Sequence, residues 1–323
     1  MSYRWMPLFG EFEVRDDAVV FRGKETPGSD AADGTLQQET RPAIGLILSN
    51  QTLSAGTLSA EITFERTDHQ AVCEVVLGYD LDSKGQISAG LGGSFAMFSI
   101  REWQPPSGPG LQQGTWKNYA LSGDLVNLQA GRPYQVEVRV AGSRVALWVD
   151  EVQVASATVN RALSHPRQSG LFCIGGADIT IHNFKVEAQR PRAFVVMQFS
   201  SPYNEVYSSV IRRVCSEMDL EPVRADELYG PGIIIKDVID QLARAQIVIA
   251  EISPANPNVY FEVGYALALQ KPIILLARRE QPDARLPFDI SAFRVLFYED
   301  SIAGKERIEE GLRNHIREIL GES

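Results

Sequence analysis

Apolar and polar residues alternate with a period of two along much of the first part of the chain, from about residue 19 to residue 186. In residues 57–64, for example, every second residue is apolar. Alternation of this kind predicts strands that bury one face. The same pattern, or a short apolar run, predicts further strands at residues 44–48, 72–79, 96–103, 134–140, 145–149, 152–159, 170–174 and 179–186. Many short strands joined by Gly, Pro and Ser predict an all-β sandwich of the jelly-roll type.

A helical period replaces this alternation after about residue 189. Residues 203–218 carry apolar side chains at i, i+3 and i+4 spacing, which predicts an amphipathic helix. Further helices are predicted at residues 235–242, 259–269 and 303–320, and strands at residues 194–199, 222–225, 247–252, 272–277 and 294–298. Strands that alternate with helices predict a parallel sheet covered on both faces, here of the flavodoxin-like α/β class. We therefore expect two domains, a β-sandwich in residues 1–188 and an α/β domain in residues 189–323.

Composition narrows the partners that we expect. The net charge of −10 disfavours nucleic acid as a partner. The first residues lack the pattern of a secretory signal, and no apolar run reaches the ~18 residues of a membrane span. Cys73, Cys173 and Cys215 lie far apart in apolar surroundings, so we expect buried thiols in a cytoplasmic protein without a membrane partner. The histidines are scattered without ligand spacing, so we expect no metal site.

Polar and aromatic side chains follow the predicted parallel strands. In an open parallel sheet the carboxyl ends of the strands meet at one edge, and ligands bind outside that edge. Candidates at these strand ends are Phe199, Ser200, Ser201 and Tyr203 after the first strand, Arg224 and Asp226 at the second, and Glu251 at the third. We expect them to line one crevice, although the aromatic side chains fit a hydrophobic core equally well.

One segment, residues 256–266, combines several signals of a helix start. Asn256 suits the N-cap and Pro257 the first helical position. Glu262 then falls within the first two turns, where the helix dipole favours an ionised carboxylate. Gly264 costs the helix about 1 kcal/mol relative to Ala, which suggests that something approaches the backbone closely. An acid near a helix start can also serve stability alone, so spacing leaves both roles open for Glu262.

Four blocks of the second half carry a family resemblance: residues 194–207, 224–227, 233–239 and 256–272. Together they resemble the nucleoside 2-deoxyribosyltransferase-like superfamily, particularly its TIR-like branch of bacterial nucleotide-binding domains. In enzymes of this family the glutamate of a Glu-x-Gly-x-Ala pattern is the catalytic carboxylate, and the resemblance assigns that role to Glu262. The acid at the end of the third strand is commonly Asp in the family, whereas Glu251 stands here.

The resemblance implies cleavage of a bond between a sugar carbon and a base nitrogen. This reaction passes through an oxocarbenium-like transition state, which a carboxylate stabilises or captures. A neutral base needs an acid to leave, for which Asp226 and Glu251 are candidates, whereas the cationic nicotinamide of NAD needs none. Arg224 or the amides of Ser200 and Ser201 are candidates to hold a phosphate. The full set of expected nucleotide-binding residues is Phe199, Ser200, Ser201, Tyr203, Arg224, Asn258 and Tyr265.

NAD or a related nucleotide is thus the expected substrate, with no bound cofactor. By resemblance, the chain is expected to be a homo-oligomeric effector of bacterial defence, with the sandwich as a sensing or assembly module. Two alternatives remain open. One is a nucleotide-sensing or scaffold protein without catalysis, and the other is a nucleoside or deoxynucleotide hydrolase, or a deoxyribosyltransferase, of salvage.

The end of the first half, residues 170–186, resembles the concanavalin and laminin-G-like jelly rolls. Members of that group often bind glycans, but a fold does not fix a function. Trp103, Trp116 and Tyr119 flank a loop rich in Pro and Gly at residues 104–114. These aromatic residues fit either a glycan or protein site, or the hydrophobic core.

Overall fold

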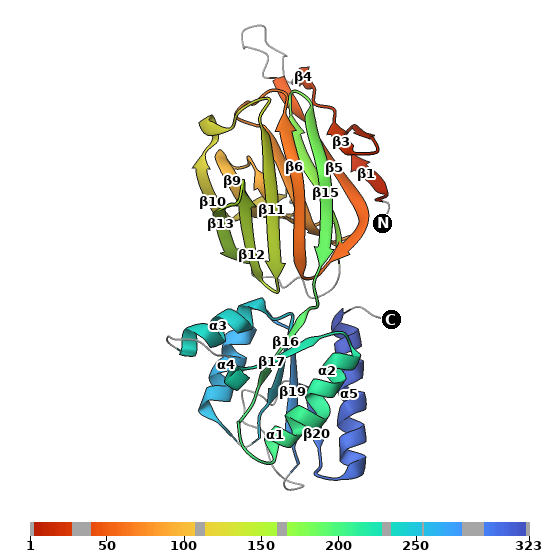
Figure 1. Ribbon diagram of the computed structural model, residues 1–323, viewed down its shortest axis with the longest axis vertical. Coiled ribbons are helices and arrows are strands. Elements are labelled where there is room, and N and C mark those ends of the chain that lie inside the picture. Colours follow the sequence, from red (N-terminus) through yellow and green to blue (C-terminus); the bar gives the residue numbers. More distant parts are fainter. Residues whose placement is uncertain are drawn as a thin grey trace. The chain divides into compact units, whose positions relative to one another are not determined.

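The computed structural model describes residues 3–27, 40–106, 114–159, 167–227, 234–253, 255–279 and 294–320. The chain forms two compact units, which are described separately (Figure 1). The first comprises Met1–Val140, Arg144–Thr158 and Arg167–Ala188, and the second consists mainly of Gln189–Ser323. In the described parts of the chain, no helix has the length and apolar character needed to cross a membrane.

The N-terminal unit is a sandwich of two antiparallel sheets, as the period-two alternation predicts. One sheet has the strand order β1-β5-β14-β7-β8-β9-β10, with β4 paired to β5, and the other has the order β13-β12-β11-β6-β15-β3-β2. The strands are β1 (Trp5–Phe9), β2 (Phe12–Val14), β3 (Ala18–Phe21), β4 (Glu25–Pro27), β5 (Thr40–Leu53), β6 (Gly56–Phe64), β7 (Val72–Tyr79), β8 (Gln86–Leu91), β9 (Ala96–Gln104), β10 (Thr115–Asp124), β11 (Pro133–Ala141), β12 (Arg144–Val149), β13 (Val152–Thr158), β14 (Arg167–Gly175) and β15 (Ile179–Ala188).

The register of β6 and β11 shows how the alternation builds the core. Ile62 lies opposite Tyr134 and Ala60 opposite Val136, and all four side chains are buried. Their neighbours along each strand point to the other face, which is largely exposed on β11. Cross-strand apolar pairs of this kind stabilise a sheet and fix its register.

The predicted aromatic cluster of the sandwich packs against the rest of its sheet. The rings of Trp103 and Trp116 are 5.3 Å apart, and Trp116 is also 5.3 Å from Phe172. Tyr119 donates a hydrogen bond to Glu102 at 2.7 Å. The centre of the predicted loop, residues 107–113, lies outside the described residues. A glycan or protein site at this cluster stays a prediction.

The C-terminal unit contains a five-stranded parallel sheet with the order β17-β16-β18-β19-β20. Numbered along the chain, this is the order 2-1-3-4-5 of flavodoxin-like sheets. Its strands are β16 (Arg192–Val196), β17 (Glu221–Arg224), β18 (Ile247–Glu251), β19 (Ile273–Arg278) and β20 (Val295–Tyr298). Its helices are α1 (Tyr203–Val206), α2 (Arg212–Glu217), α3 (Ile234–Arg244), α4 (Pro257–Ala268) and α5 (Ile302–Leu320).

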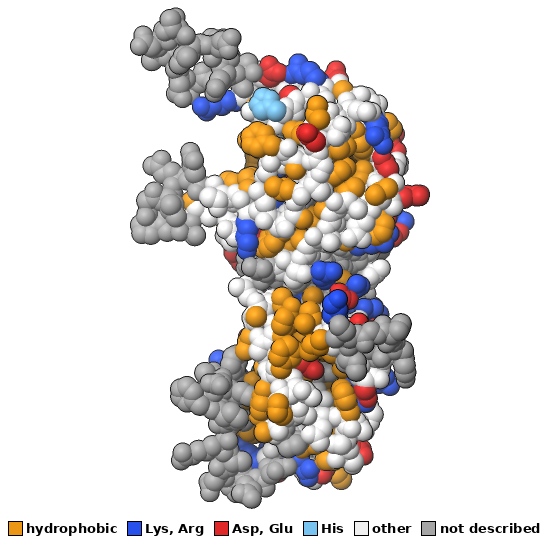
Figure 2. All heavy atoms as spheres, turned by 90° about the vertical axis from the view of Figure 1, so that its left-hand side faces the viewer, with side chains coloured by type: hydrophobic (Ala, Val, Ile, Leu, Met, Phe, Trp, Pro, Cys, Tyr) orange, Lys and Arg blue, Asp and Glu red, His pale blue; other side chains and the backbone are white. Residues whose placement is uncertain are grey.

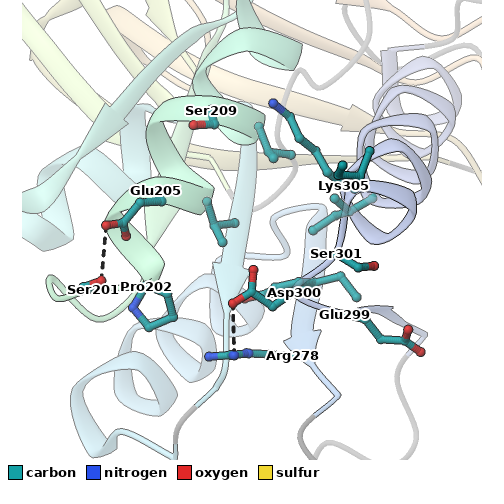
Figure 3. Close-up of a pocket in the computed structure, with 14 residues that line it drawn as sticks. Ser201, Pro202, Glu205, Ser209, Arg278, Glu299, Asp300, Ser301 and Lys305 are labelled. Carbon is teal, nitrogen blue, oxygen red and sulfur yellow. Dashed lines mark hydrogen bonds and ion pairs between the residues drawn. The ribbon is translucent and has the colours of Figure 1, made fainter.

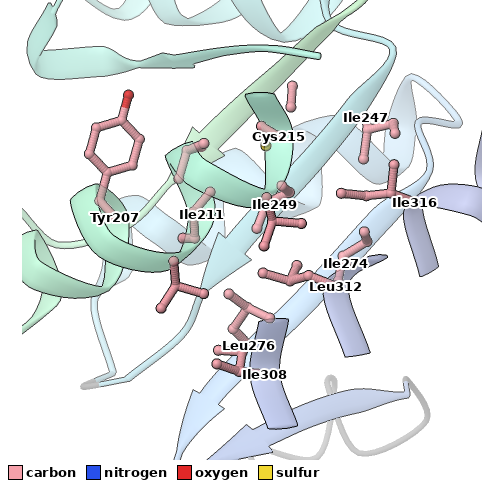
Figure 4. Packing of buried hydrophobic residues seen from close by; sticks show 14 of the residues in the cluster. Tyr207, Ile211, Cys215, Ile247, Ile249, Ile274, Leu276, Ile308, Leu312 and Ile316 are labelled. Atoms are coloured by element: carbon pink, nitrogen blue, oxygen red, sulfur yellow. The ribbon is translucent and has the colours of Figure 1, made fainter. Parts of the chain in front are cut away.

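Helices cover both faces of this sheet, so its central strands are apolar on both sides. Ile247 and Ile249 of β18 face a cluster that includes side chains of α2 and α5 (Figure 4). Val248 and Ala250, on the opposite face, pack with side chains of α3 and α4. This double burial explains why β18 shows a continuous apolar run rather than alternation.

The helix predicted at residues 203–218 differs in one detail from the regular pattern. A π-helical segment, Tyr207–Ile211, lies between α1 and α2. Such a wide turn adds a residue to the local repeat. Within and just after this segment Tyr207, Val210, Ile211 and Val214 are all buried.

Candidate active site

The strand order places a topological switch between β16 and β18. After β16 the chain turns to α1, which packs on the sheet face of Val195, whereas α4 follows β18 and packs on the face of Val196. The connections therefore diverge at the carboxyl ends of these two strands. In sheets of this order ligands bind in the crevice that this divergence opens.

Helix α4 begins as the sequence predicts. The Oδ1 atom of Asn256 accepts a hydrogen bond from the backbone N–H of Asn258 at 3.0 Å, and Pro257 follows the cap. Asn258 thus contributes its backbone to the cap, while its side chain is exposed. One turn further along, Glu262 is half-buried.

Burial raises the pKa of the Glu262 carboxyl group to about 7. This shift runs opposite to the effect expected from the helix dipole, because burial removes the hydration of the carboxylate. Among the described residues, the Glu262 carboxyl group has no hydrogen-bond or ion-pair partner. A half-buried acid without a partner is suited to interact with a bound ligand.

Glu251 also has a raised pKa, but its surroundings differ. Its side chain is 1% exposed at the end of β18, and burial raises its pKa to about 8. The carboxyl group accepts a hydrogen bond from the Ser253 backbone N–H at 3.1 Å and one from the Tyr298 hydroxyl at 3.3 Å. Glu251 therefore ties β18 to β20, and it is closed to solvent in this structure.

Arg224 is the centre of a cluster at the ends of β16 and β17. Its guanidinium donates two hydrogen bonds of 2.6 Å to the Asp226 carboxylate and one of 2.9 Å to Asn204 Oδ1. It lies 4.2 Å from the ring centroid of Tyr207 and 5.3 Å from that of Phe199. The cation thus supports one side of the Phe199 ring, which is 48% exposed. Arg224 and Asp226 form a bidentate ion pair, so a ligand that binds either group competes with that pair.

Two predicted serines lie on the turn between β16 and α1. The Ser200 hydroxyl accepts a hydrogen bond from Gln198 Nε2 at 2.8 Å. The Ser201 hydroxyl donates to Glu205 Oε1 at 3.2 Å. Both serines therefore lie near the carboxyl end of β16, next to the switch crevice. Their role in binding a ligand stays a prediction.

The two predicted tyrosines occupy different environments. Tyr203 is buried in the cluster beneath α1, so the structure places it in the core rather than on an open surface. Tyr265 is half-buried on α4, and its ring stacks with that of Phe261 at 6.4 Å. Tyr265 is the one of the pair that retains access to a ligand.

A pocket of about 600 Å³ opens between α1 and the start of α5 (Figure 3). Its lining includes Ser201, Tyr298 and Lys305, and Arg278 donates to Asp300 at 3.2 Å at one side. Glu262 is not among its described lining residues. The pocket and Glu262 therefore belong to helices on opposite faces of the sheet.

The sequence analysis missed Tyr298 as a part of this region, and it placed Asn204 after the first strand without its contact to Arg224. Asn204 accepts a hydrogen bond from Arg224, and Tyr298 donates one to Glu251. Tyr298 ends a short strand, and only the order of β18, β19 and β20 brings it near Glu251. No spacing along the chain signals either contact.

Comparison with known proteins gives a partial relative. No protein-family model matches the chain. A stretch of 72 residues is 32% identical to the 5-hydroxymethyl-dUMP N-hydrolase of Rattus norvegicus, and it covers 22% of this chain and 44% of that protein. The chain thus spans less than half the length of this curated relative.

Two solved structures of low sequence identity cover different shares of the chain. The carbohydrate binding module CBM66 from Bacillus subtilis is 15% identical, covers 57% of this chain and 94% of its own, and has a TM-score of 0.42. The CMP N-glycosidase BcmB from Clostridium botulinum is 18% identical, covers 38% of this chain and 98% of its own, and has a TM-score of 0.29. These scores assign no function to the chain.

Proposed function

We propose that the C-terminal unit hydrolyses the N-glycosidic bond of a nucleotide, with Glu262 as the carboxylate that contacts the sugar. The observation that carries the proposal is the half-buried Glu262 carboxyl group, whose pKa is raised to about 7 and which has no partner among the described residues. Burying a carboxyl group without a partner costs free energy, and such costs are typical of functional sites.

A carboxylate is suited to this reaction. As the bond between C1′ and the base nitrogen breaks, its electron pair leaves with the base and positive charge develops on the sugar. The Glu262 carboxylate either holds this charge or captures C1′ as an ester. Water then adds to C1′, and on the ester route the bond between C1′ and the Glu262 oxygen breaks as it does so. The proton that water loses ends on the departed base of a monophosphate, or in solvent where the leaving group is nicotinamide. Either route gives the free base and a sugar that keeps its phosphate.

A nucleoside 5′-monophosphate is the substrate that we favour. The partial relative is named for hydrolysis of 5-hydroxymethyl-dUMP, a molecule of this class. The half-exposed Phe199 ring, supported by Arg224, offers a flat apolar surface on which a base can stack.

NAD is the second candidate. The carboxylate of Asp226 is engaged by Arg224, and Glu251 is closed to solvent. Neither predicted acid is therefore poised to protonate a neutral base. The nicotinamide of NAD is cationic and leaves without protonation, which fits this arrangement. With NAD as the substrate, the role of Glu262 is the same and only the leaving group differs.

The test is release of free base from a panel of substrates. Purified protein is incubated with 5-hydroxymethyl-dUMP, dUMP, CMP or NAD, and the products are separated by chromatography. We expect Glu262→Gln to reduce base release at least 100-fold while it keeps nucleotide binding. Glu310→Gln, a neutralising change at an exposed position of α5, is the matched control and should keep full activity.

Four outcomes distinguish the hypotheses. Nicotinamide release would select NAD, and release of uracil, cytosine or a modified base would select a monophosphate. Binding without base release by the wild type would leave a nucleotide-sensing protein. Equal turnover by wild type and Glu262→Gln would remove Glu262 from the chemistry.

A further inference from the structure

The proposed reaction does not use the pocket between α1 and α5, and the chemistry of this pocket suits a small molecule. Exposed hydrophobic side chains gather on the side of the C-terminal unit that carries α3 and α4 (Figure 2), whereas the pocket combines apolar and charged side chains. Its volume of about 600 Å³ lies within the ~300–1,000 Å³ of small-molecule sites. Its apolar lining includes Val206, Val210, Tyr298 and Ile308. An apolar lining with a few polar groups is typical of a site that binds one small ligand.

Two walls of the pocket carry opposite charges. Glu205 extends from α1 and Lys305 from α5, and Figure 3 shows the Lys305 side chain reaching toward α1. Glu205 Oε1 accepts a hydrogen bond from the Ser201 hydroxyl at 3.2 Å, and its second oxygen has no partner among the described residues. The Lys305 ammonium lies 4.0 Å from Glu309 Oε1 and donates no hydrogen bond to a described residue. One wall can therefore accept a hydrogen bond from a ligand, and the other can bind an anionic group.

The remaining charged lining residues limit the charge of the ligand. Arg278 donates a hydrogen bond to Asp300 at 3.2 Å, and Glu299 is exposed. Three acidic and two basic residues thus line the pocket, so their charges sum to −1. A ligand with several anionic groups would be repelled, whereas a single anionic group can be held at Lys305.

We infer that the pocket between α1 and α5 is a second nucleotide site, which binds a nucleoside monophosphate whose base carries an amino group. The phosphate binds Lys305, the amino group donates a hydrogen bond to Glu205, and the rings pack on the apolar lining. In such a molecule the phosphate and the amino group lie at opposite ends, as the two walls require. A neutral amino acid has its ammonium and carboxylate on one carbon, so it cannot reach both walls. The inference does not depend on the proposed function, since Glu262 is not among the described lining residues of the pocket.

Two lining residues of the pocket hold the segment that leads into α4. The Tyr298 hydroxyl donates a hydrogen bond to Glu251 at 3.3 Å, and the backbone N–H of Arg278 donates one to Ser253 Oγ at 2.9 Å. A nucleotide in the pocket therefore packs against the residues that hold the end of β18. Its binding should slow amide hydrogen exchange in residues 251–253.

Isothermal titration calorimetry of the full chain with dCMP tests the inference. The parent protein for the titration is Glu262→Gln, which stops the proposed hydrolysis. In this parent, Lys305→Met should weaken one binding event at least tenfold, because the phosphate loses a charge-assisted hydrogen bond. Arg307→Met, the same loss of charge at an exposed position of α5 outside the pocket lining, should bind dCMP as the parent does. Circular dichroism spectra should be the same for all variants.

The base of the ligand provides a second test. In dUMP a carbonyl oxygen replaces the amino group of dCMP, so dUMP should bind the site that depends on Lys305 at least tenfold more weakly. In the Glu205→Gln variant the two nucleotides should bind this site alike, because an amide both donates and accepts hydrogen bonds.

The outcomes separate this inference from the proposed function. A single binding event that Lys305→Met weakens would support the second site even if the switch crevice binds no nucleotide. Equal binding of dCMP by the parent and by Lys305→Met, or no binding up to about 1 mM dCMP, would overturn the inference. Equal affinity of the site that depends on Lys305 for dCMP and dUMP would overturn it as well.

Discussion

Glu251 and Glu262 of the C-terminal unit both have pKa values raised towards neutrality, to about 8 and about 7. In both cases burial is the main cause, because a buried carboxylate loses its hydration. The consequences differ, since Glu251 is bonded to Ser253 and Tyr298 whereas Glu262 has no partner among the described residues. Glu251 is thus suited to join strands, and Glu262 to meet a ligand.

The raised pKa of Glu262 predicts the pH dependence of catalysis. The proposed chemistry needs the carboxylate, which is the minor form below about pH 7. We therefore expect kcat/KM to rise about tenfold per unit below pH 7 and to level off above it. Initial rates at constant ionic strength from pH 5 to 9 measure this. A flat profile would show that ionisation of Glu262 does not limit the reaction.

The raised pKa of Glu251 predicts a pH dependence of stability. The unfolded carboxyl group ionises near pH 4.5, whereas the folded one stays protonated to about pH 8. The folded state is therefore favoured most below pH 4.5, and this contribution is lost as the pH rises through 8. Relative to the wild type, Glu251→Gln should gain on the order of 4 kcal/mol between pH 5 and pH 9. Urea unfolding at both pH values measures the change, and an equal effect at both would contradict it.

At the scale of elements, the N-cap of α4 fixes the start of the helix that carries Glu262. Asn256→Ala removes the acceptor for the Asn258 N–H and should cost about 1 kcal/mol of unfolding free energy. Asn256→Asp keeps an acceptor and serves as the control. Chemical denaturation of both variants checks this, and a loss below about 0.3 kcal/mol in Asn256→Ala would show that the cap is unimportant.

Long elements with a clear period were predictable, whereas short ones were missed. Strands β6 and β11 follow from strict alternation, and β18 follows from an apolar run that is buried on both faces. Strand β8 was not predicted although Ile87, Ala89 and Leu91 alternate with Gln86, Ser88 and Gly90, because the run has only six residues and both of its faces are buried. Strand β1 is a run of five apolar residues that are largely exposed at the edge of the sheet, so its sequence does not show the alternation of a half-buried strand.

The candidate site was predictable only where a local rule applied. The cap, the proline and the glutamate of α4 follow from spacing within one segment. Two hydrogen bonds of the site depend on strand order and join side chains that are far apart in the chain. They run from Tyr298 to Glu251 and from Arg224 to Asn204. The pKa of Glu262 depends on burial, which the helix position alone does not reveal.

At the scale of the whole molecule, the chain contains two units of different fold. The C-terminal unit has the switch crevice and Glu262, and the N-terminal unit is an antiparallel sandwich. We expect the proposed activity to belong to the C-terminal unit alone. A role of the sandwich in sensing or assembly stays a prediction.

The product balance of a single reaction tests the proposed hydrolysis most directly. Wild-type protein is incubated with 5-hydroxymethyl-dUMP, and the free base and the sugar phosphate are quantified together by mass spectrometry. We expect equal amounts of 5-hydroxymethyluracil and deoxyribose 5-phosphate, at least 100-fold less of both with Glu262→Gln, and full activity with Glu310→Gln. Inorganic phosphate and an intact nucleoside, or equal base release by wild type and Glu262→Gln, would contradict it.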